Sequence, residues 1–177
     1  MSQLSYESLC ESSFGHLEEI VRTQPAPSFE SLAGWEFRGF NVAVLTEALR
    51  IRKFKKGFYA DARDPSRLYG YNVRVEQNGR RRPWVPVLRH GQPLRHGLYD
   101  VTRVTTEGPD GLYPQSLLLN YGCGRNPTLD PSRFLRDYLV RAAPNELDLL
   151  VGKAYIALGP VRVPGGYFVL ERYNKVS

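Results

Sequence analysis

The segment Gly34-Trp35-Glu36-Phe37-Arg38-Gly39-Phe40-Asn41 carries the pattern that decides the fold. Its large apolar side chains, Trp35 and Phe37, alternate with the charged Glu36 and Arg38. Successive side chains of a β-strand point to opposite faces, so this alternation is typical of a strand with one buried face. We therefore expect a strand from residue 35 to residue 41, with Trp35 and Phe37 on the same face.

Further strand signals follow at short spacing along the chain. Turn-forming residues separate them, among them Asn78-Gly79 and the segment 107–111. Pro83 and Pro86 favour an edge position for one of these segments. The predicted strands cover residues 54–60, 67–76, 84–88, 97–105, 115–121, 147–158 and 167–173.

The composition agrees with many short strands joined by turns. The chain has 177 residues, of which 11 are Tyr, 8 are Phe, 16 are Gly and 13 are Pro, with one Met. Aromatic residues favour strands, and Gly and Pro favour turns. A hydrophobic fraction of 42% is enough for one folded domain and excludes an intrinsically disordered chain.

Helical signals are few and lie mostly at the N-terminus. Residues 4–22 repeat apolar side chains at helical spacing, and Pro25-Ala26-Pro27 ends that pattern. Residues 28–34 suggest a short turn, 42–49 fit a strand or a short helix, and Asp130 is a suitable N-cap for a helical turn. We expect an N-terminal helix and linker over residues 1–27 and a β-barrel domain over 28–177.

The predicted fold class is all-β with an N-terminal helix, in the form of an antiparallel up-and-down β-barrel. About seven to nine strands at short spacing are typical of a barrel or a sandwich. A parallel α/β fold is disfavoured, because it requires helices between the strands.

The two ends of this pattern resemble the calycin superfamily, which includes the lipocalins and the fatty-acid-binding proteins. An N-terminal helix precedes Gly34-Trp35, and the last predicted strand reads Tyr167-Phe-Val-Leu-Glu-Arg172. In calycins a Trp of the first strand packs on a cation of the last strand and closes the barrel, and Trp35 and Arg172 match those positions. The chain is most similar to small bacterial proteins with a Gly-x-Trp-x-Gly signature and a C-terminal domain of unknown function. The nitrobindin branch holds haem through a late His, whereas the last His here is His96, so no cofactor is predicted.

A barrel of this size has a lumen that side chains fill or that holds one small ligand. Aromatic and polar side chains facing the lumen would select that ligand, and arginines could hold a carboxylate head group. Core packing for each Tyr and a solvent-facing position for each Arg are the alternatives. The predicted ligand-binding residues are Tyr69, Tyr71, Arg74, Tyr99, Asn120, Arg136, Tyr155 and Tyr167, with Arg103 as a further arginine.

Nothing in the sequence completes a catalytic or metal-binding motif. His90 and His96 lack Cys or carboxylate partners at ligand spacing, and Asp100 is one acid without a nucleophile. Cys10 and Cys123 are expected to be free thiols, which favours the cytoplasm. The N-terminus lacks the pattern of a secretory signal, and no apolar run is long enough for a membrane span.

The net charge of +6 comes mainly from two basic runs, residues 50–56 and 80–82. We expect both to be solvated loops, the second at a hairpin tip after Asn78-Gly79. No zinc-finger spacing, helix-turn-helix or aromatic RNA-binding motif accompanies them, so nucleic acid is not an expected partner.

Two main functions follow from this reading. The first is a binding or carrier protein that holds a small apolar or amphipathic ligand, anionic or neutral, in the barrel lumen. The alternative is a small barrel enzyme, such as a cyclase or isomerase, acting on a bound organic substrate. An interaction module using its basic face is a third option. The oligomeric state, a homodimer included, stays open.

Overall fold

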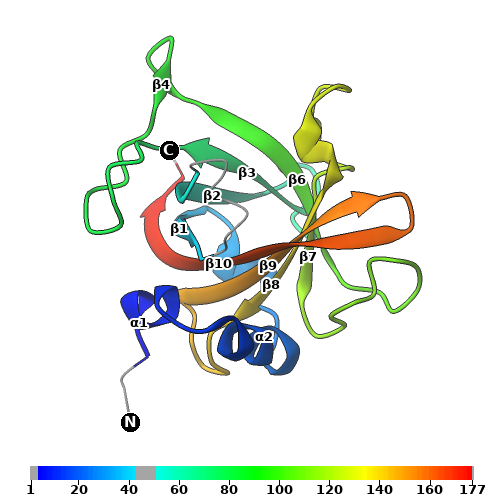
Figure 1. Cartoon of the computed structure of the whole chain (residues 1–177). Helices are drawn as coiled ribbons and strands as arrows, with labels where there is room; N and C mark the ends of the chain where they lie inside the picture. The colour runs from blue at the N-terminus through cyan, green and yellow to red at the C-terminus, as the bar shows by residue number, and fades with distance from the viewer. Residues whose placement is uncertain (1–3, 43–50, 177) are drawn as a thin grey trace.

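The chain folds into a closed barrel of eight antiparallel strands, in the spatial order β1-β10-β9-β8-β7-β6-β3-β2 (Figure 1). The computed structural model describes residues 4–42 and 51–176. The barrel strands are β1 (Trp35–Asn41), β2 (Lys53–Ala60), β3 (Leu68–Arg74), β6 (Arg95–Arg103), β7 (Leu117–Asn120), β8 (Leu135–Arg141), β9 (Leu149–Leu158) and β10 (Val161–Lys175). The predicted fold class is therefore confirmed.

Strand β1 closes the barrel, because it pairs with β2 on one side and with β10 on the other. Its bounds are those expected from the sequence. The guanidinium carbon of Arg172 lies 4.6 Å from the centre of the Trp35 ring, and Lys175 Nζ lies 3.9 Å from it. The contact between the first and last strands that the sequence suggested is thus present, with a second cation on the same ring.

The N-terminal region forms three short helices: α1 (Tyr6–Cys10), α2 (Phe14–Thr23) and α3 (Phe29–Leu32). The prediction of one helix over 4–22 was wrong because Ser13 starts a new helix, its side chain accepting a hydrogen bond from the His16 N–H. Ser28 caps α3 in the same way, through the Ser31 N–H.

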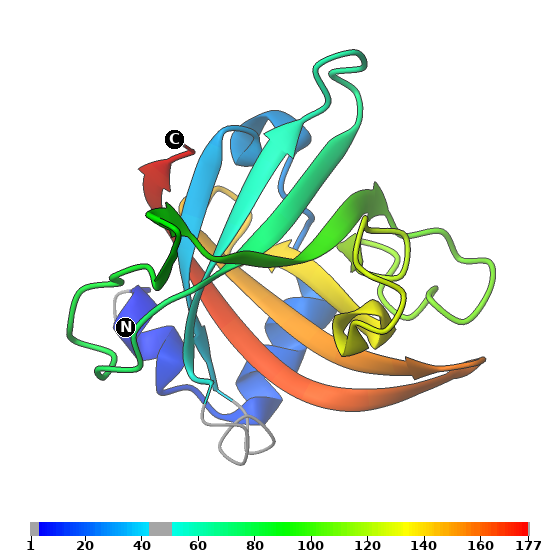
Figure 2. The same cartoon turned by 90° about the horizontal axis from the view of Figure 1, so that it is seen from above.

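Two other predictions need correction. Residues 161–166, expected to be a loop, form the first part of β10 and pair with β9 in a hairpin that extends past the rest of the barrel (Figure 2). Of the expected strand over 84–88, only Leu88 lies in a strand, the two-residue β4 (Leu88–Arg89), which pairs with β5 (Gln92–Pro93). Pro86 forms an isolated bridge with Val75. The ambiguous segment 42–49 lies outside the described residues except for Val42.

A predicted helical turn is confirmed at η1 (Pro131–Phe134), where the Asp130 side chain accepts a hydrogen bond from the Ser132 N–H. Strand β8 follows this turn directly. The sequence pattern did not predict β8, because its outward and inward faces are both largely buried and no alternation marks it.

Two apolar cores share the barrel wall. The first fills the lumen, where Leu32 of α3 packs with Phe37 and Phe58 at one end. The second lies outside the barrel, where α1 and α2 cover β8, β9 and β10 (Figure 1). An outer face covered by helices can bury aromatic and apolar side chains that would otherwise face solvent. In the described part of the chain, no helix is long and apolar enough to cross a membrane.

Candidate functional site

The end of the lumen nearest α3 is a solid core. Phe37, Phe58, Leu117, Leu139 and Leu170 line it, and each is 0% exposed. A void large enough for a water molecule would leave accessible area on the side chains around it. No ligand therefore fits beside these residues without displacing them.

A lysine occupies the middle of the lumen. Lys56 Nζ donates hydrogen bonds to Asp137 Oδ2 (2.8 Å), to Asn72 Oδ1 (3.1 Å) and to the Tyr121 hydroxyl. The Tyr121 hydroxyl donates in turn to Asp137 Oδ2 (2.9 Å). Asp137 faces inward on β8, Asn72 on β3 and Lys56 on β2, so three strands bring the cluster together.

Aromatic rings enclose the Lys56 ammonium group. Its Nζ lies 4.9 Å from the centre of the Tyr99 ring and 5.1 Å from those of Tyr121 and Phe168. Burial lowers the pKa of Lys56, and the neighbouring Asp137 carboxylate opposes that shift. The arrangement holds one charge pair in a nearly dry interior, where each partner depends on the other.

The opposite end of the lumen carries two more basic side chains. Arg74 lies directly across from Phe54, and His96 lies across from Asn72. Residues paired across antiparallel strands share a face, so both belong to the lumen face. Burial and the charge of Lys56 lower the pKa of His96. At this end, the wall formed by β3 and β6 thus carries the Arg74 guanidinium and the His96 imidazole, whose charged form burial disfavours.

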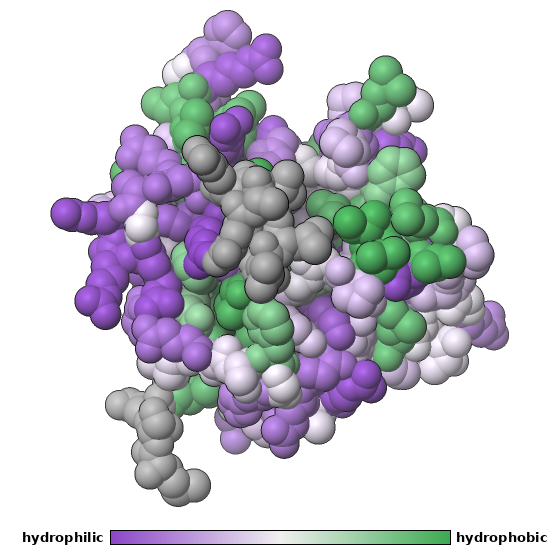
Figure 3. All heavy atoms as spheres, viewed as in Figure 1, coloured by the Kyte–Doolittle hydropathy of each residue, from purple (hydrophilic) through white to green (hydrophobic). Residues whose placement is uncertain are grey.

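The facing wall is apolar. Strands β8, β9 and β10 lie across the barrel from β3 and β6 in the strand order. The lumen face of the β9–β10 hairpin continues past the barrel rim through Ile156, Val163, Leu158 and Val161, which pair with one another across the hairpin. Leu158 is 55% exposed and Val161 57%. Figure 3 shows hydrophobic side chains gathered over this hairpin.

Of the predicted ligand-binding residues, Tyr99 and Arg74 are on the lumen face. Tyr99 is fully buried, and its hydroxyl donates to the Gly57 carbonyl at 3.2 Å, so it belongs to the packed core. Arg74 is exposed at the open end. Ligand binding by either residue stays a prediction.

The other predicted site residues lie on the outer wall, so their expected position in the lumen was wrong. Tyr71 donates to Glu36 Oε1 (3.0 Å), and Tyr167 donates to Glu18 Oε2 (2.7 Å) on α2. The Tyr155 hydroxyl lies 3.0 Å from that of Tyr113. The row Tyr69, Asp100, Asn120, Arg136 and Tyr155 runs across neighbouring strands, each residue paired with the next.

Physical reasons for this outward placement are visible in the packing. Helix α2 covers β8 and β9, so Tyr155 can be buried while pointing outward. Gly57 leaves room for the Tyr71 ring on the outer wall, since a Cβ there would lie 2.3 Å from Tyr71 Cζ. Arg103, the further arginine, ends β6 and lines a surface cavity.

The expectation that the basic run at 50–56 is a solvated loop is wrong for residues 53–56, which lie in a buried strand; Arg50 lies outside the described residues. Lys53, Lys55 and Lys56 belong to β2 and are 1%, 5% and 2% exposed. Lys53 Nζ donates to the carbonyls of Gly79, Arg82 and Pro83, each at 3.0 Å. Lys55 Nζ bonds Glu36 Oε2 (3.3 Å) and Asn174 Oδ1 (2.9 Å). The alternation of Phe54, Lys56 and Phe58 was the one available signal that Lys56 faces inward.

The two cysteines are free, Cys10 buried and Cys123 exposed, as expected. Among the described residues there is no cluster of three or more His, Cys, Asp or Glu side chains that could hold a metal ion.

Comparison with protein-family models, with curated proteins and with solved structures finds no match to this chain. The fold itself, a closed antiparallel barrel of eight strands, is consistent with a calycin-like architecture.

Proposed function

We propose that this chain is a calycin-type binding protein for a small amphipathic anion, held at the open end of the lumen. The observation that carries the proposal is that the Arg74 guanidinium and the polar His96 imidazole face an apolar wall at that end. Arg74 and His96 lie on the lumen face of β3 and β6, and Ile156 and Val163 lie on the lumen face of the β9–β10 hairpin.

The chemistry of the two walls suits the two parts of such a ligand. An anionic head group would contact Arg74 in a charge-assisted hydrogen bond, near the Lys56–Asp137 pair at the floor. The apolar part would lie on the hairpin and cover side chains that are now exposed, which removes apolar area from water. The free thiols of Cys10 and Cys123 favour the cytoplasm as the location.

The test uses 1-anilinonaphthalene-8-sulfonate, a fluorescent amphipathic anion, with dodecanoate and dodecanol as competitors. Native protein should bind the probe saturably, and dodecanoate should displace it better than the uncharged dodecanol. Arg74→Ala and Val163→Asp should each weaken binding about tenfold, which corresponds to the loss of one good contact. Arg89→Ala, which removes an exposed arginine of β4, is the charge-matched control.

Equal displacement by dodecanoate and dodecanol, together with unchanged affinity in Arg74→Ala, would contradict the proposal. The probe also binds to proteins whose tertiary packing is lost. Near-ultraviolet circular dichroism of each variant shows whether that packing is intact, so that the measured binding can be assigned to a specific site.

One observation favours the alternative, a barrel enzyme. Lys56 is a buried amine whose pKa burial lowers, next to a hydroxyl and a carboxylate, which is a setting for amine catalysis on a carbonyl substrate. Cinnamaldehyde would condense with the amine to an imine and release water, and cyanoborohydride would reduce the imine to a stable adduct. An adduct on Lys56, located by peptide mass spectrometry, supports the enzyme, whereas adducts confined to exposed Lys175 and the N-terminus argue against it.

A further inference from the structure

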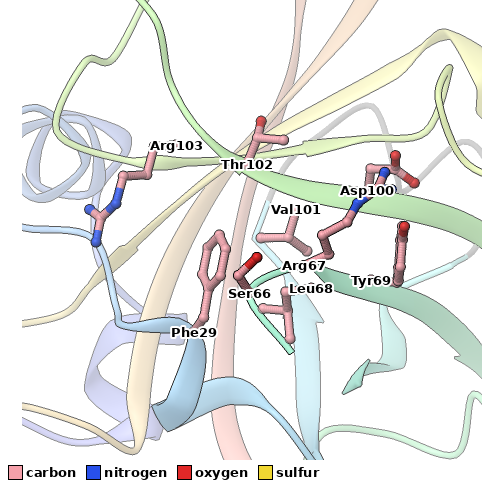
Figure 4. Close-up of a pocket in the computed structure, with 9 residues that line it drawn as sticks. All are labelled: Phe29, Ser66, Arg67, Leu68, Tyr69, Asp100, Val101, Thr102 and Arg103. Carbon is pink, nitrogen blue, oxygen red and sulfur yellow. The ribbon is translucent and has the colours of Figure 1, made fainter. Parts of the chain in front are cut away.

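The outer wall of β2, β3 and β6 carries two adjoining cavities away from the open end of the lumen. The first has a volume of about 320 Å³ and lies beside Phe29 of α3 (Figure 4). The second has a volume of about 460 Å³ and lies beside the loops at Asp61 and Gly124. Both volumes are within the range of about 300–1,000 Å³ that small-molecule sites occupy.

Two residues belong to both cavities, which are therefore neighbours on this wall. Tyr69 and Asp100 are paired across β3 and β6 and line each cavity. Figure 4 shows Arg67 extending toward Asp100 beside the Tyr69 ring. Helices α1 and α2 pack against β8, β9 and β10, on a different part of the barrel wall. They therefore do not cover these two cavities.

A row of tilted aromatic rings runs along the two cavities, two of whose members, Tyr59 and Tyr69, line them. The Tyr59 and Tyr69 rings lie 5.8 Å apart with a 37° angle between their planes, and Tyr71 continues the row 6.1 Å from Tyr59. The guanidinium carbon of Arg67 lies 5.4 Å from the centre of the Tyr69 ring. Tyr59 is 40% exposed, so its ring offers a face on which another planar ring can stack.

The charges around these rings are mostly positive. Four arginines line the two cavities, against the two aspartates Asp61 and Asp100; they are Arg63, Arg67, Arg103 and Arg125. Asp61 is already engaged in its own turn, accepting from the Arg63 and Asp64 N–H groups. Partial burial raises the pKa of the Asp100 carboxyl, and the nearby charges of Arg67 and Arg125 oppose that shift.

We infer that the two neighbouring cavities together bind a planar aromatic ring that carries a phosphate, a ligand of the size of a mononucleotide. The ring stacks on the exposed Tyr59 beside Tyr69, and Arg63 and Arg125, which line the second cavity, receive the phosphate. Asp100 accepts hydrogen bonds from ring or sugar donors between them. This site is separate from the open end of the lumen, so it can be tested independently of the function proposed above.

The test is isothermal titration calorimetry with adenosine 5′-monophosphate at low and high salt. Adenosine has the ring without the phosphate, and ribose 5-phosphate has the phosphate without the ring. Each should therefore bind at least about tenfold more weakly than adenosine 5′-monophosphate. Tyr69→Leu and Arg125→Gln should each raise the Kd about tenfold, and raised salt should weaken binding because the phosphate contacts are ionic.

Two control variants make the result specific. Arg89→Gln removes an exposed arginine that lines neither cavity, and Arg74→Ala alters only the open end of the lumen; both should keep the wild-type Kd. No saturable binding at millimolar ligand, or equal weakening by Arg89→Gln and Arg125→Gln, would overturn the inference. Binding of a single-stranded oligonucleotide without binding of the mononucleotide would also overturn it, because the wall would then act as an extended basic surface.

Discussion

Lys56 shows how a single residue can constrain the interior of this barrel. A lysine is rarely buried unless it is paired, and here Asp137, Tyr121 and Asn72 satisfy all three donors of its ammonium group. Such a pair contributes little net stability compared with a well-packed apolar pair, but losing one partner leaves an uncompensated charge. Lys56 and Asp137 are therefore best understood as one unit.

We predict that Asp137→Asn lowers the free energy of unfolding by about 3–5 kcal/mol, because the Lys56 charge loses its counter-ion in a buried site. Urea denaturation followed by circular dichroism measures the change. Asp148→Asn is the matched control: Asp148 pairs with Arg172, but its side chain is 63% exposed, and exposed pairs contribute about 0–1 kcal/mol. The double variant Lys56→Met/Asp137→Leu should recover most of the loss. Equal losses of unfolding free energy in Asp137→Asn and Asp148→Asn would contradict the prediction, because the buried pair would then matter no more than an exposed one.

Among the elements, α2 is attached to the barrel by a polar contact within an apolar interface. Glu18 of α2 accepts hydrogen bonds from Lys153 Nζ (2.7 Å), Tyr167 (2.7 Å) and Tyr113 (3.1 Å). Leu17 and Val21 of the same helix pack into the outer core, each 0% exposed. The carboxylate therefore fixes the position of a helix that apolar contacts alone would hold less specifically.

Acid should loosen this helix. Burial raises the pKa of Glu18, but the hydrogen bonds from Lys153, Tyr167 and Tyr113 outweigh it and hold the pKa at about 2, below its ordinary value of 4.5. A depressed pKa contributes stability that is fully present above the unfolded value and is lost as the pH falls from about 4.5 toward 2. Glu18→Gln should remove this part of the acid dependence, whereas Glu19→Gln, at an exposed neighbour, should keep it. Urea midpoints measured from pH 7 to pH 2 test this, and parallel curves for wild type and Glu18→Gln would contradict it.

The elements also show what the sequence could and could not predict. Alternation located β1, and turn residues located most other strands, because these signals are local. The direction in which each strand faces was harder to predict. Tyr155 points outward and is still buried, because α2, more than 130 residues earlier in the chain at Leu17, covers it. A local sequence pattern does not show that a segment distant in the chain covers a side chain. The pattern therefore led to the expectation that the outer-wall tyrosines face the lumen.

For the molecule as a whole, the basic charge is distributed differently from what the sequence suggested. The chain has five lysines, and Lys53, Lys55, Lys56 and Lys153 are buried, so arginines carry most of the exposed positive charge. Each buried lysine joins elements that are distant in sequence. Lys53 Nζ bonds the carbonyls of the loop at 79–83, for example, and lies 4.2 Å from the centre of the Trp84 ring. The lysines thus serve as internal connections, and a reagent for amines reports on the integrity of the whole fold.

We predict that N-hydroxysuccinimidyl acetate modifies one lysine of the native protein, the exposed Lys175, together with the N-terminal amine. The other four amines are engaged in buried hydrogen bonds, and acylation requires an accessible, uncharged amine, so they should react only when the chain opens. Peptide mass spectrometry after a short pulse at neutral pH measures each site, and the same pulse in urea, where all five should react, is the control. Glu18→Gln should release Lys153 first, because that amine loses its carboxylate partner while the lumen stays closed. Modification of native Lys56 or Lys55 as fast as Lys175 would contradict the packing of the barrel.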